Sequence, residues 1–207
     1  MAGALDKLKV VDLTRTLAGP FCTMSTGDMG AEVVKIEEPT GGDETRKWTP
    51  FVNGESTQFL TFNRNKRSLS VNLKEPEGLK IVKDMAADAD VMIESFRAGT
   101  LERLGLGYEE IKKINPGIVY CSISGYGRSG PMANMPGYDL LIQAYSGLMS
   151  LTGDPDGSPL RIGFSLVDLF TGMMAYGTIL TALRQKEQTG KGQWVEAALL
   201  DGQVAAL

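Results

Sequence analysis

The chain has 207 residues, 43% of them hydrophobic, so it is long enough to bury a substantial core and near the upper size of one compact domain. Lysine and arginine number 21 against 25 acidic residues, and the net charge of −4 argues against nucleic acid as a partner. The absence of histidine excludes imidazole bases, Ser-His-Asp and Cys-His nucleophile systems, and His-ligated metal sites.

The two cysteines, Cys22 and Cys121, lie far apart in the sequence and form no CxxC pair, so neither a disulfide framework nor a thiolate metal site is expected. This cysteine usage fits a reducing compartment, and we expect a cytoplasmic protein without a metal. The N-terminus shows no apolar signal region, and no later apolar run approaches the ~18 residues of a membrane helix. We therefore expect no membrane association.

Short runs rich in β-branched residues recur along the chain with helical patterns between them. The runs, which predict strands, are residues 9–13, 32–36, 68–72, 90–94 and 117–123. Pro76 opens a helical pattern that continues to residue 86, while residues 39–58 show neither period and predict a long surface loop. This alternation predicts an α/β fold, with a Rossmann-like open, mostly parallel sheet and helices on both faces.

The second half of the chain begins with many glycines and prolines between residues 125 and 159, around one helical segment at 138–149. Residues 168–185 are apolar and predict a buried helix. Residues 195–207 read as an apolar helical run that stops without a cap signal, as if cut within a structure. Residues 1–207 are expected to form a single domain, and we expect the apolar side chains of that last run to be left partly uncovered.

Asp168 is a lone carboxylate among apolar residues, including Phe164, Leu166 and Phe170. A carboxylate in such a setting is partly desolvated and reactive, as covalent catalysis by aspartate requires. A purely structural alternative is that Ser165 caps a helix in which Asp168 occupies the third position, where the helix dipole favours a negative charge. The pattern by itself favours this alternative about two to one.

Two cationic segments are candidates for phosphate binding. The first is Asn63-Arg-Asn-Lys-Arg67 with Lys74, which is more often a solvated face. The second is Phe96, Arg97 and Arg103, which follow a predicted strand at the end where open α/β sheets bind ligands. The glycine-rich segment 124–130 also follows a strand, but it lacks the Rossmann G-x-G-x-x-G register and the Walker lysine.

Taken in order, these segments resemble the class III CoA-transferase family (formyl-CoA transferase-like) over essentially the whole chain. Each motif is weak alone, and the ordered set is highly specific. The motifs are Val11-Asp-Leu-Thr14, Leu17-Ala-Gly-Pro20, Gly30-Ala-Glu-Val-Val-Lys-Ile-Glu37, Gly42-Asp43, Asn65-Lys-Arg-Ser68, Ser124-Gly-Tyr-Gly127, Gly153-Asp-Pro-Asp-Gly157 and Thr189-Gly-Lys-Gly-Gln193.

The resemblance implies a CoA-binding large domain and transfer of CoA from an acyl-CoA thioester to a carboxylic acid. Asp168 matches the family's aspartate, which forms a mixed anhydride and then an aspartyl-CoA thioester. The positions that match the family's coenzyme A contacts are Leu17, Ala18, Val71, Asn72, Leu73, Lys74, Ser95, Phe96, Arg97 and Arg103, with Tyr138 near the reacting end.

Two departures from the family qualify this resemblance. Glu38 stands where formyl-CoA transferase has an arginine for the nucleotide end, so Lys74 or Arg103 would have to compensate. Family members also continue into a smaller domain and pair as interlocked dimers, so the resemblance covers the larger domain only. It implies either a homodimer or pairing with a chain that supplies the smaller domain.

Two other functions remain open beside CoA transfer. The CoA-thioester racemases of the same superfamily use a histidine and an aspartate, and the histidine position corresponds here to Tyr138, so one base is missing. A non-catalytic CoA-binding subunit of a split enzyme is the second alternative. The donor and acceptor acids cannot be read from the residues.

Overall fold

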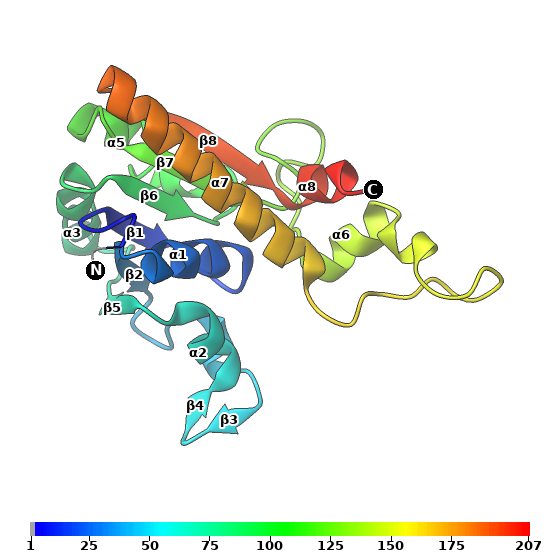
Figure 1. Cartoon of the computed structure of the whole chain (residues 1–207). Helices are drawn as coiled ribbons and strands as arrows, with labels where there is room; N and C mark the ends of the chain where they lie inside the picture. Colours follow the sequence, from blue (N-terminus) through cyan, green and yellow to red (C-terminus); the bar gives the residue numbers. More distant parts are fainter. Residues whose placement is uncertain (1–2) are drawn as a thin grey trace.

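A six-stranded, entirely parallel sheet forms the centre of the computed structural model, which describes residues 3–207 (Figure 1). The strands are β1 (Lys9–Leu13), β2 (Glu32–Glu37), β5 (Lys66–Ser70), β6 (Val91–Glu94), β7 (Val119–Ser124) and β8 (Gln193–Ala198). They lie in the order β5-β2-β1-β6-β7-β8, and every neighbouring pair is parallel. The predicted α/β fold is confirmed.

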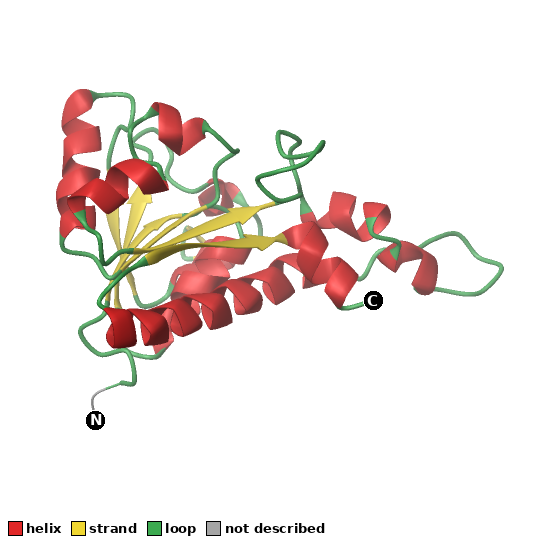
Figure 2. Cartoon of the chain, turned by 90° about the horizontal axis from the view of Figure 1, so that it is seen from above, coloured by secondary structure: helices red, strands yellow, loops and turns green. Residues whose placement is uncertain are grey.

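Helices cover both faces of this sheet, as Figure 2 shows. Consecutive strand residues point to opposite faces, so Val10 packs in one hydrophobic core and Val11 in the other. The first core includes residues of α1 (Ala18–Asp28) and α7 (Leu166–Thr189). The second includes residues of α3 (Pro76–Ala87), α4 (Thr100–Arg103) and α5 (Tyr108–Ile114).

Smaller elements lie beside the edge strand β5 and past the carboxyl ends of the strands (Figure 1). An arm projects below β5 in Figure 1 and consists of a 3-10 helix (η1, Glu44–Lys47), the antiparallel hairpin of β3 (Phe51–Val52) and β4 (Glu55–Ser56), and α2 (Thr57–Asn63). Beyond β7 lie α6 (Asp139–Tyr145), a second 3-10 helix (η2, Leu148–Leu151) and α8 (Leu199–Ala205). The predicted loop at 39–58 therefore contains short regular elements.

Other element boundaries differ from the sequence-based prediction in informative ways. The helical run expected at 195–207 is wrong in its first part, because residues 193–198 pair with β7 as a strand and only Leu199–Ala205 is helical. Pairing with β7 overrides the helix propensity of Glu196, Ala197 and Ala198 in this strand. The third strand begins two residues earlier than predicted, and α1 was not predicted.

The long helix α7 has an 18-residue window with mean hydropathy 1.5, so by length and composition it is apolar enough to cross a membrane. The expectation that no apolar run reaches this length was therefore wrong. Core helices of soluble proteins meet the same criteria. Here α7 packs along α1 and also contacts β7, β8 and α8.

The strand order reverses between β1 and β6. From β1 the chain proceeds to β2 and β5 on one side, then crosses back to β6 on the other, so Leu13 and Glu94 lie in register as neighbours. The loops that leave the carboxyl ends of β1 and β6 diverge at this point. In open α/β sheets, such a reversal is where ligands bind.

Candidate active site

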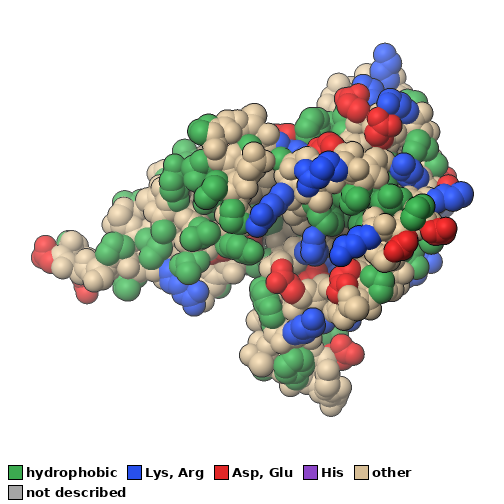
Figure 3. Space-filling view, turned by 180° about the vertical axis from the view of Figure 1, so that it is seen from behind, with side chains coloured by type: hydrophobic (Ala, Val, Ile, Leu, Met, Phe, Trp, Pro, Cys, Tyr) green, Lys and Arg blue, Asp and Glu red, His purple; other side chains and the backbone are tan. Residues whose placement is uncertain are grey.

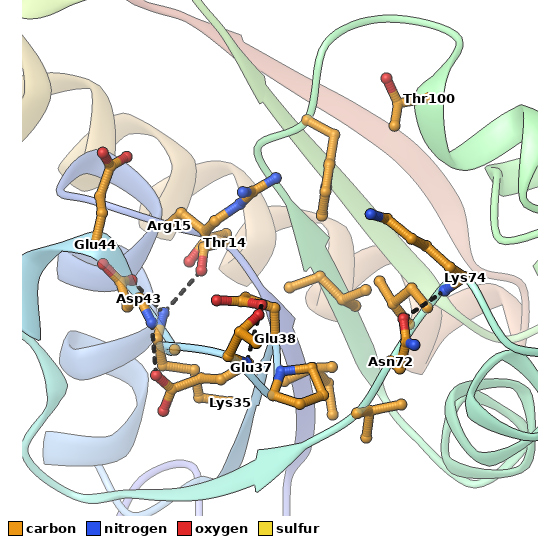
Figure 4. Close-up of a pocket in the computed structure, with 18 of the residues that line it drawn as sticks. Thr14, Arg15, Lys35, Glu37, Glu38, Asp43, Glu44, Asn72, Lys74 and Thr100 are labelled. Carbon is orange, nitrogen blue, oxygen red and sulfur yellow. Dashed lines mark hydrogen bonds and ion pairs between the residues drawn. The ribbon is translucent and has the colours of Figure 1, made fainter.

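Two adjoining cavities occupy the carboxyl edge of the sheet at this reversal. The larger has a volume of about 830 Å³ and the smaller about 430 Å³. Arg15, Glu44, Phe96 and Thr100 line both, so the two share a wall. Figure 4 shows the larger cavity, and Figure 3 shows acidic and basic side chains side by side over the central part of one face.

The structure brings all the sequence-predicted site residues to these two cavities. The larger cavity is lined by Val71, Asn72, Leu73, Lys74, Phe96 and Arg103. The smaller is lined by Leu17, Ala18, Ser95, Phe96, Arg97, Tyr138 and Asp168. Segments from the ends of β1, β5, β6 and α7 thus form one elongated site, with Asp168 in its smaller part.

Asp168 lies in the first turn of α7, and its side chain is half-buried. Burial, together with the negative charge of nearby Asp139, raises the pKa of Asp168 to about 7. The structural alternative for this segment is correct in its placement, because Ser165 is the N-cap residue and Asp168 lies in the first turn of α7, but the Ser165 side chain makes no capping hydrogen bond. Asp168 is thus a carboxylate with elevated basicity that faces a cavity.

The cap of α7 comes instead from Asp139, the first residue of α6. Its Oδ2 atom accepts hydrogen bonds from the backbone N–H groups of Val167 at 2.8 Å and Asp168 at 3.2 Å. Gln143 donates to the other carboxylate oxygen and accepts from the N–H of Ile162. Asp139 therefore fixes where α7 begins and so positions Asp168; sequence reasoning did not assign it this role.

Two glycines allow the walls of the smaller cavity to meet. A Cβ atom on Gly125 would lie 2.4 Å from the Cα of Gly137, so only glycine permits this approach. The contact joins the segment after β7 to the segment that carries Tyr138. Nearby, the buried Oγ of Ser124 has no hydrogen-bond partner within residues 3–207, and Ser124 lines the cavity.

A buried ionic cluster supports the segment after β1. Lys35 on β2 pairs with Asp43 at 2.9 Å and donates to the Thr14 carbonyl at 2.7 Å, and both charged side chains are almost inaccessible. Lys66 on β5 contacts Asp12 at 3.2 Å. Burial opposes ionisation of Asp12, but Lys66 and Lys35 prevail and hold its pKa at about 2.

This cluster holds a backbone turn formed by residues 14–16. Thr16 has a φ of 69°, which is uncommon for a β-branched residue. Its N–H donates to the Asp43 carboxylate at 3.3 Å, and its hydroxyl donates to Glu44 at 3.0 Å. The turn places Arg15 at the wall between the cavities.

Arg15 lines both cavities and was not among the residues predicted from the sequence. It lies two residues after the end of β1, as Phe96 lies two residues after the end of β6, so the rule that selected Phe96 and Arg97 applies to it as well.

The cations of the larger cavity include Arg15, Lys47, Lys74 and Arg103. Glu38 also lines this cavity, opposite Lys74 in Figure 4, so the carboxylate that departs from the family pattern does face the site. Glu37 is neutralised by Arg46, with a 2.7 Å ion pair. The larger cavity thus offers unpaired basic groups suited to phosphates.

Residues 3–207 hold no cluster of three or more Cys, Asp or Glu side chains placed to bind a metal ion. The chemistry that the arrangement can support is carboxylate-based. A half-buried aspartate of raised pKa lies beside a long cavity with cations at its far part. Such a site can hold an elongated, phosphate-bearing thioester with its acyl end near the aspartate.

Comparison with known proteins gives consistent matches over the whole chain. The family model described as CoA-transferase family III matches residues 5–207. Succinyl-CoA:glutarate CoA-transferase from Mus musculus is 54% identical over 98% of this chain, and acetyl-CoA:oxalate CoA-transferase from Acetobacter aceti is 46% identical over 99%.

Among solved structures, a CAIB/BAIF family protein from Brucella suis superposes with a TM-score of 0.96, at 44% identity over 100% of this chain and 56% of that chain. The mouse and Acetobacter matches cover 47% and 53% of those proteins, so the chain spans about half the length of the curated relatives it matches. On the match of the family model over residues 5–207, this chain belongs to CoA-transferase family III.

Proposed function

We propose that this chain is the CoA-binding large domain of an enzyme that transfers CoA from an acyl-CoA thioester to a carboxylic acid, with Asp168 as the covalent nucleophile. The observation that carries the proposal is the position of Asp168. It is half-buried with a raised pKa, in a cavity contiguous with a larger one lined by unpaired cations. A cytoplasmic location remains part of this proposal, and both cysteines are free and buried.

The proposed reaction needs no group beyond the two substrates and Asp168. The carboxylate attacks the thioester carbonyl carbon, and the C–S bond breaks. CoA leaves as a thiolate, and the acyl group remains on Asp168 as a mixed anhydride. The thiolate then attacks the Asp168 carbonyl, releasing the donor acid and leaving an aspartyl-CoA thioester. The acceptor carboxylate repeats the two steps in reverse and regenerates the Asp168 carboxylate.

We propose that at least one of the two acids is a dicarboxylic acid, because the mouse relative's name specifies succinyl and glutarate and the Acetobacter relative's name specifies acetyl and oxalate. A substrate of this class brings a second negative charge into the cavity that holds Asp168. That cavity contains the guanidinium groups of Arg15 and Arg97, whose charge is of the required sign.

Trapping the covalent intermediate tests the proposed function directly. The chain is incubated with an acyl-CoA, digested and examined by mass spectrometry for CoA attached to the peptide that contains Asp168. CoA attached to this peptide would show that the chain forms the covalent intermediate, which a non-catalytic CoA-binding subunit does not. Exchange of the α-proton of the acyl group without CoA transfer would favour the racemase alternative, for which the chain lacks a histidine.

Arg103→Ala is expected to weaken CoA binding by about 1.5–3 kcal/mol, the usual scale for hydrogen bonds to charged groups. Arg103 lines the larger cavity, and its guanidinium donates a hydrogen bond to the Thr100 hydroxyl at 3.3 Å. Isothermal titration calorimetry with CoA measures the change. Unchanged affinity would place the phosphates elsewhere, with Lys74 the next residue to replace.

Apolar side chains are exposed along residues 135–173, and two of them, Met135 and Tyr138, line the smaller cavity. Figure 3 shows hydrophobic side chains gathered on the elongated part of the molecule. The side chains in this range that are more than 45% exposed are Met135, Tyr138, Leu140, Leu141, Tyr145, Leu151, Leu160, Phe164 and Met173. The patch expected from the last segment is smaller than predicted, because Leu199 is buried and Val195 and Leu200 pack against the core, which leaves residues 204–207 exposed. Large exposed apolar surfaces mark interaction sites.

We therefore predict that the chain self-associates as a homodimer or pairs with a polypeptide that supplies the smaller domain, and has little transferase activity alone. A water-excluding cover over the aspartyl thioester would come from the partner. Light scattering combined with a CoA-transfer assay tests both parts. A monodisperse monomer with full activity would refute the prediction.

A further inference from the structure

Several buried or acidic side chains hold the backbone turn at residues 14–16. Thr16 has a left-handed backbone, a strained conformation for a β-branched residue that persists only when its surroundings enforce it. Its N–H and hydroxyl bind Asp43 and Glu44, and the preceding Thr14 carbonyl accepts from the buried Lys35 ammonium. Strained backbone of this kind clusters at functional sites.

The residue at the centre of this turn is Arg15. Its N–H donates to the Ser95 hydroxyl at 3.0 Å, which ties the end of β1 to the end of β6. Its guanidinium carbon lies 4.5 Å from the centroid of the Phe96 ring, over the ring face, a cation–π contact. The backbone and the side chain of Arg15 are thus both held by neighbours.

The Arg15 guanidinium has no ion pair and donates no hydrogen bond to another side chain or backbone group within residues 3–207, although other cationic groups nearby are paired. Lys35 and Lys66 meet Asp43 and Asp12 in the cluster below, and Arg46 meets Glu37. In Figure 4 the Arg15 and Lys74 side chains point into the open cavity from opposite sides. A guanidinium that is oriented but unpaired is prepared for an oxyanion, which its planar fork can bind through two hydrogen bonds.

We infer that Arg15 forms an anion subsite in the wall shared by the two cavities. The inference rests on the proposed function and deepens it, because an acyl-CoA that spans both cavities must pass Arg15. Two groups of the substrate have the required chemistry. One is the diphosphate of CoA, and the other is the second carboxylate of a dicarboxylic acyl group.

The test compares Arg15→Gln and Arg15→Lys with a matched control, Arg184→Gln, in the whole chain. Arg184 is an exposed arginine on α7 that pairs with Glu187 and lines neither cavity. All variants also carry Asp168→Asn so that acyl transfer cannot consume the ligand. Calorimetry measures the affinity for four ligands: CoA, pantetheine, succinyl-CoA and butyryl-CoA.

If Arg15 binds the diphosphate, Arg15→Gln weakens CoA and both acyl-CoAs by roughly ten- to a hundredfold, the scale of a charge-assisted hydrogen bond, and leaves pantetheine unchanged. If Arg15 binds the acyl carboxylate, only succinyl-CoA is weakened and its advantage over butyryl-CoA disappears. Arg15→Lys gives a smaller loss in either case, because it keeps the charge without the fork.

Affinities equal to those of the Arg184→Gln control for all four ligands would overturn the inference. A parent chain that binds none of the CoA compounds would instead refute the proposed function. The anion subsite is then tested with inorganic pyrophosphate and succinate as probes. Equal binding of the probes by the parent and by Arg15→Gln would refute the subsite, and so would a failure of both proteins to bind them. Thermal unfolding checks that each variant is folded, and Arg15→Lys provides the comparison if the glutamine variant is not.

Discussion

Replacement of Asp168 with alanine is expected to abolish CoA transfer, with a loss of roughly 10⁴-fold or more, because removal of a covalent nucleophile leaves only binding and orientation. CoA affinity is expected to stay within a few-fold. Lys74 and Arg103, which we propose bind the phosphates, line the larger cavity, whereas Asp168 lines the smaller one. The variant should also form no CoA adduct in the trapping experiment.

Steady-state kinetics and calorimetry on the same preparations measure the two effects separately. Asp84→Ala is the matched control, since it removes an exposed carboxylate on α3 that pairs only with Lys80 across one helical turn. Turnover by Asp168→Ala at the parental rate would exclude Asp168 as the nucleophile.

The raised pKa of Asp168 adds a pH dependence to this prediction. With a pKa of about 7, the reactive carboxylate form increases as the pH rises through 7, so adduct formation should follow the same curve. The fold favours the protonated form, so this site stabilises the protein fully below the ordinary pKa of 3.8 and loses that contribution as the pH rises through 7. Asp168→Asn should therefore unfold at a higher temperature than the parent at pH 8, and at the same temperature below about pH 4.

Replacement of Lys35 with methionine is expected to destabilise the protein by about 3–5 kcal/mol, because it leaves the Asp43 carboxylate buried without its counter-charge. Both side chains are only 1–2% exposed, so water cannot compensate. The Thr14 carbonyl also loses its donor. Urea unfolding measures the loss, and the turn that carries Arg15 should loosen with it.

Two further variants separate the ion pair from its surroundings. Lys80→Met removes a lysine that pairs with Asp84, and the two side chains are 75% and 64% exposed. The free energy of unfolding is expected to change by no more than about 1 kcal/mol. The double variant Lys35→Met/Asp43→Asn should lose less stability than Lys35→Met, since no unpaired charge remains and the asparagine Oδ1 can still accept from Thr45. Equal stability of Lys35→Met and the parent would show that the buried pair contributes nothing.

Much of the sheet could be predicted, because its strands are buried on both faces and so appear as short β-branched runs. Residues 9–13, 32–36 and 90–94 were located within one residue of their observed ends. Residues 195–198 have a local sequence that favours a helix, because Glu196, Ala197 and Ala198 are good helix formers. Their strand conformation depends on pairing with β7, about seventy residues earlier, and a local pattern cannot reveal that contact.

The candidate site likewise contains residues that the sequence could identify and residues that it could not. Phe96, Arg97 and Arg103 could be selected because residues that follow a parallel strand lie at the ligand-binding edge of the sheet. The role of Asp139 could not be predicted, because this residue caps a helix that begins 27 residues later in the sequence. The role of Lys35 was equally hidden, because a lysine within a strand carries no sign that a loop carboxylate will meet it.

The sequence by itself determined the alternation of strands and helices, the exclusion of histidine chemistry and the family resemblance that singled out Asp168, because these depend on residue identity and short-range order. Tertiary structure alone decided that Asp139 caps α7, that Lys35 and Asp43 support a strained turn, and that Arg15 is left unpaired between two cavities. Each of these features joins groups far apart in the chain. Burial and the lowered dielectric around them, which arise only on folding, give those contacts their energy.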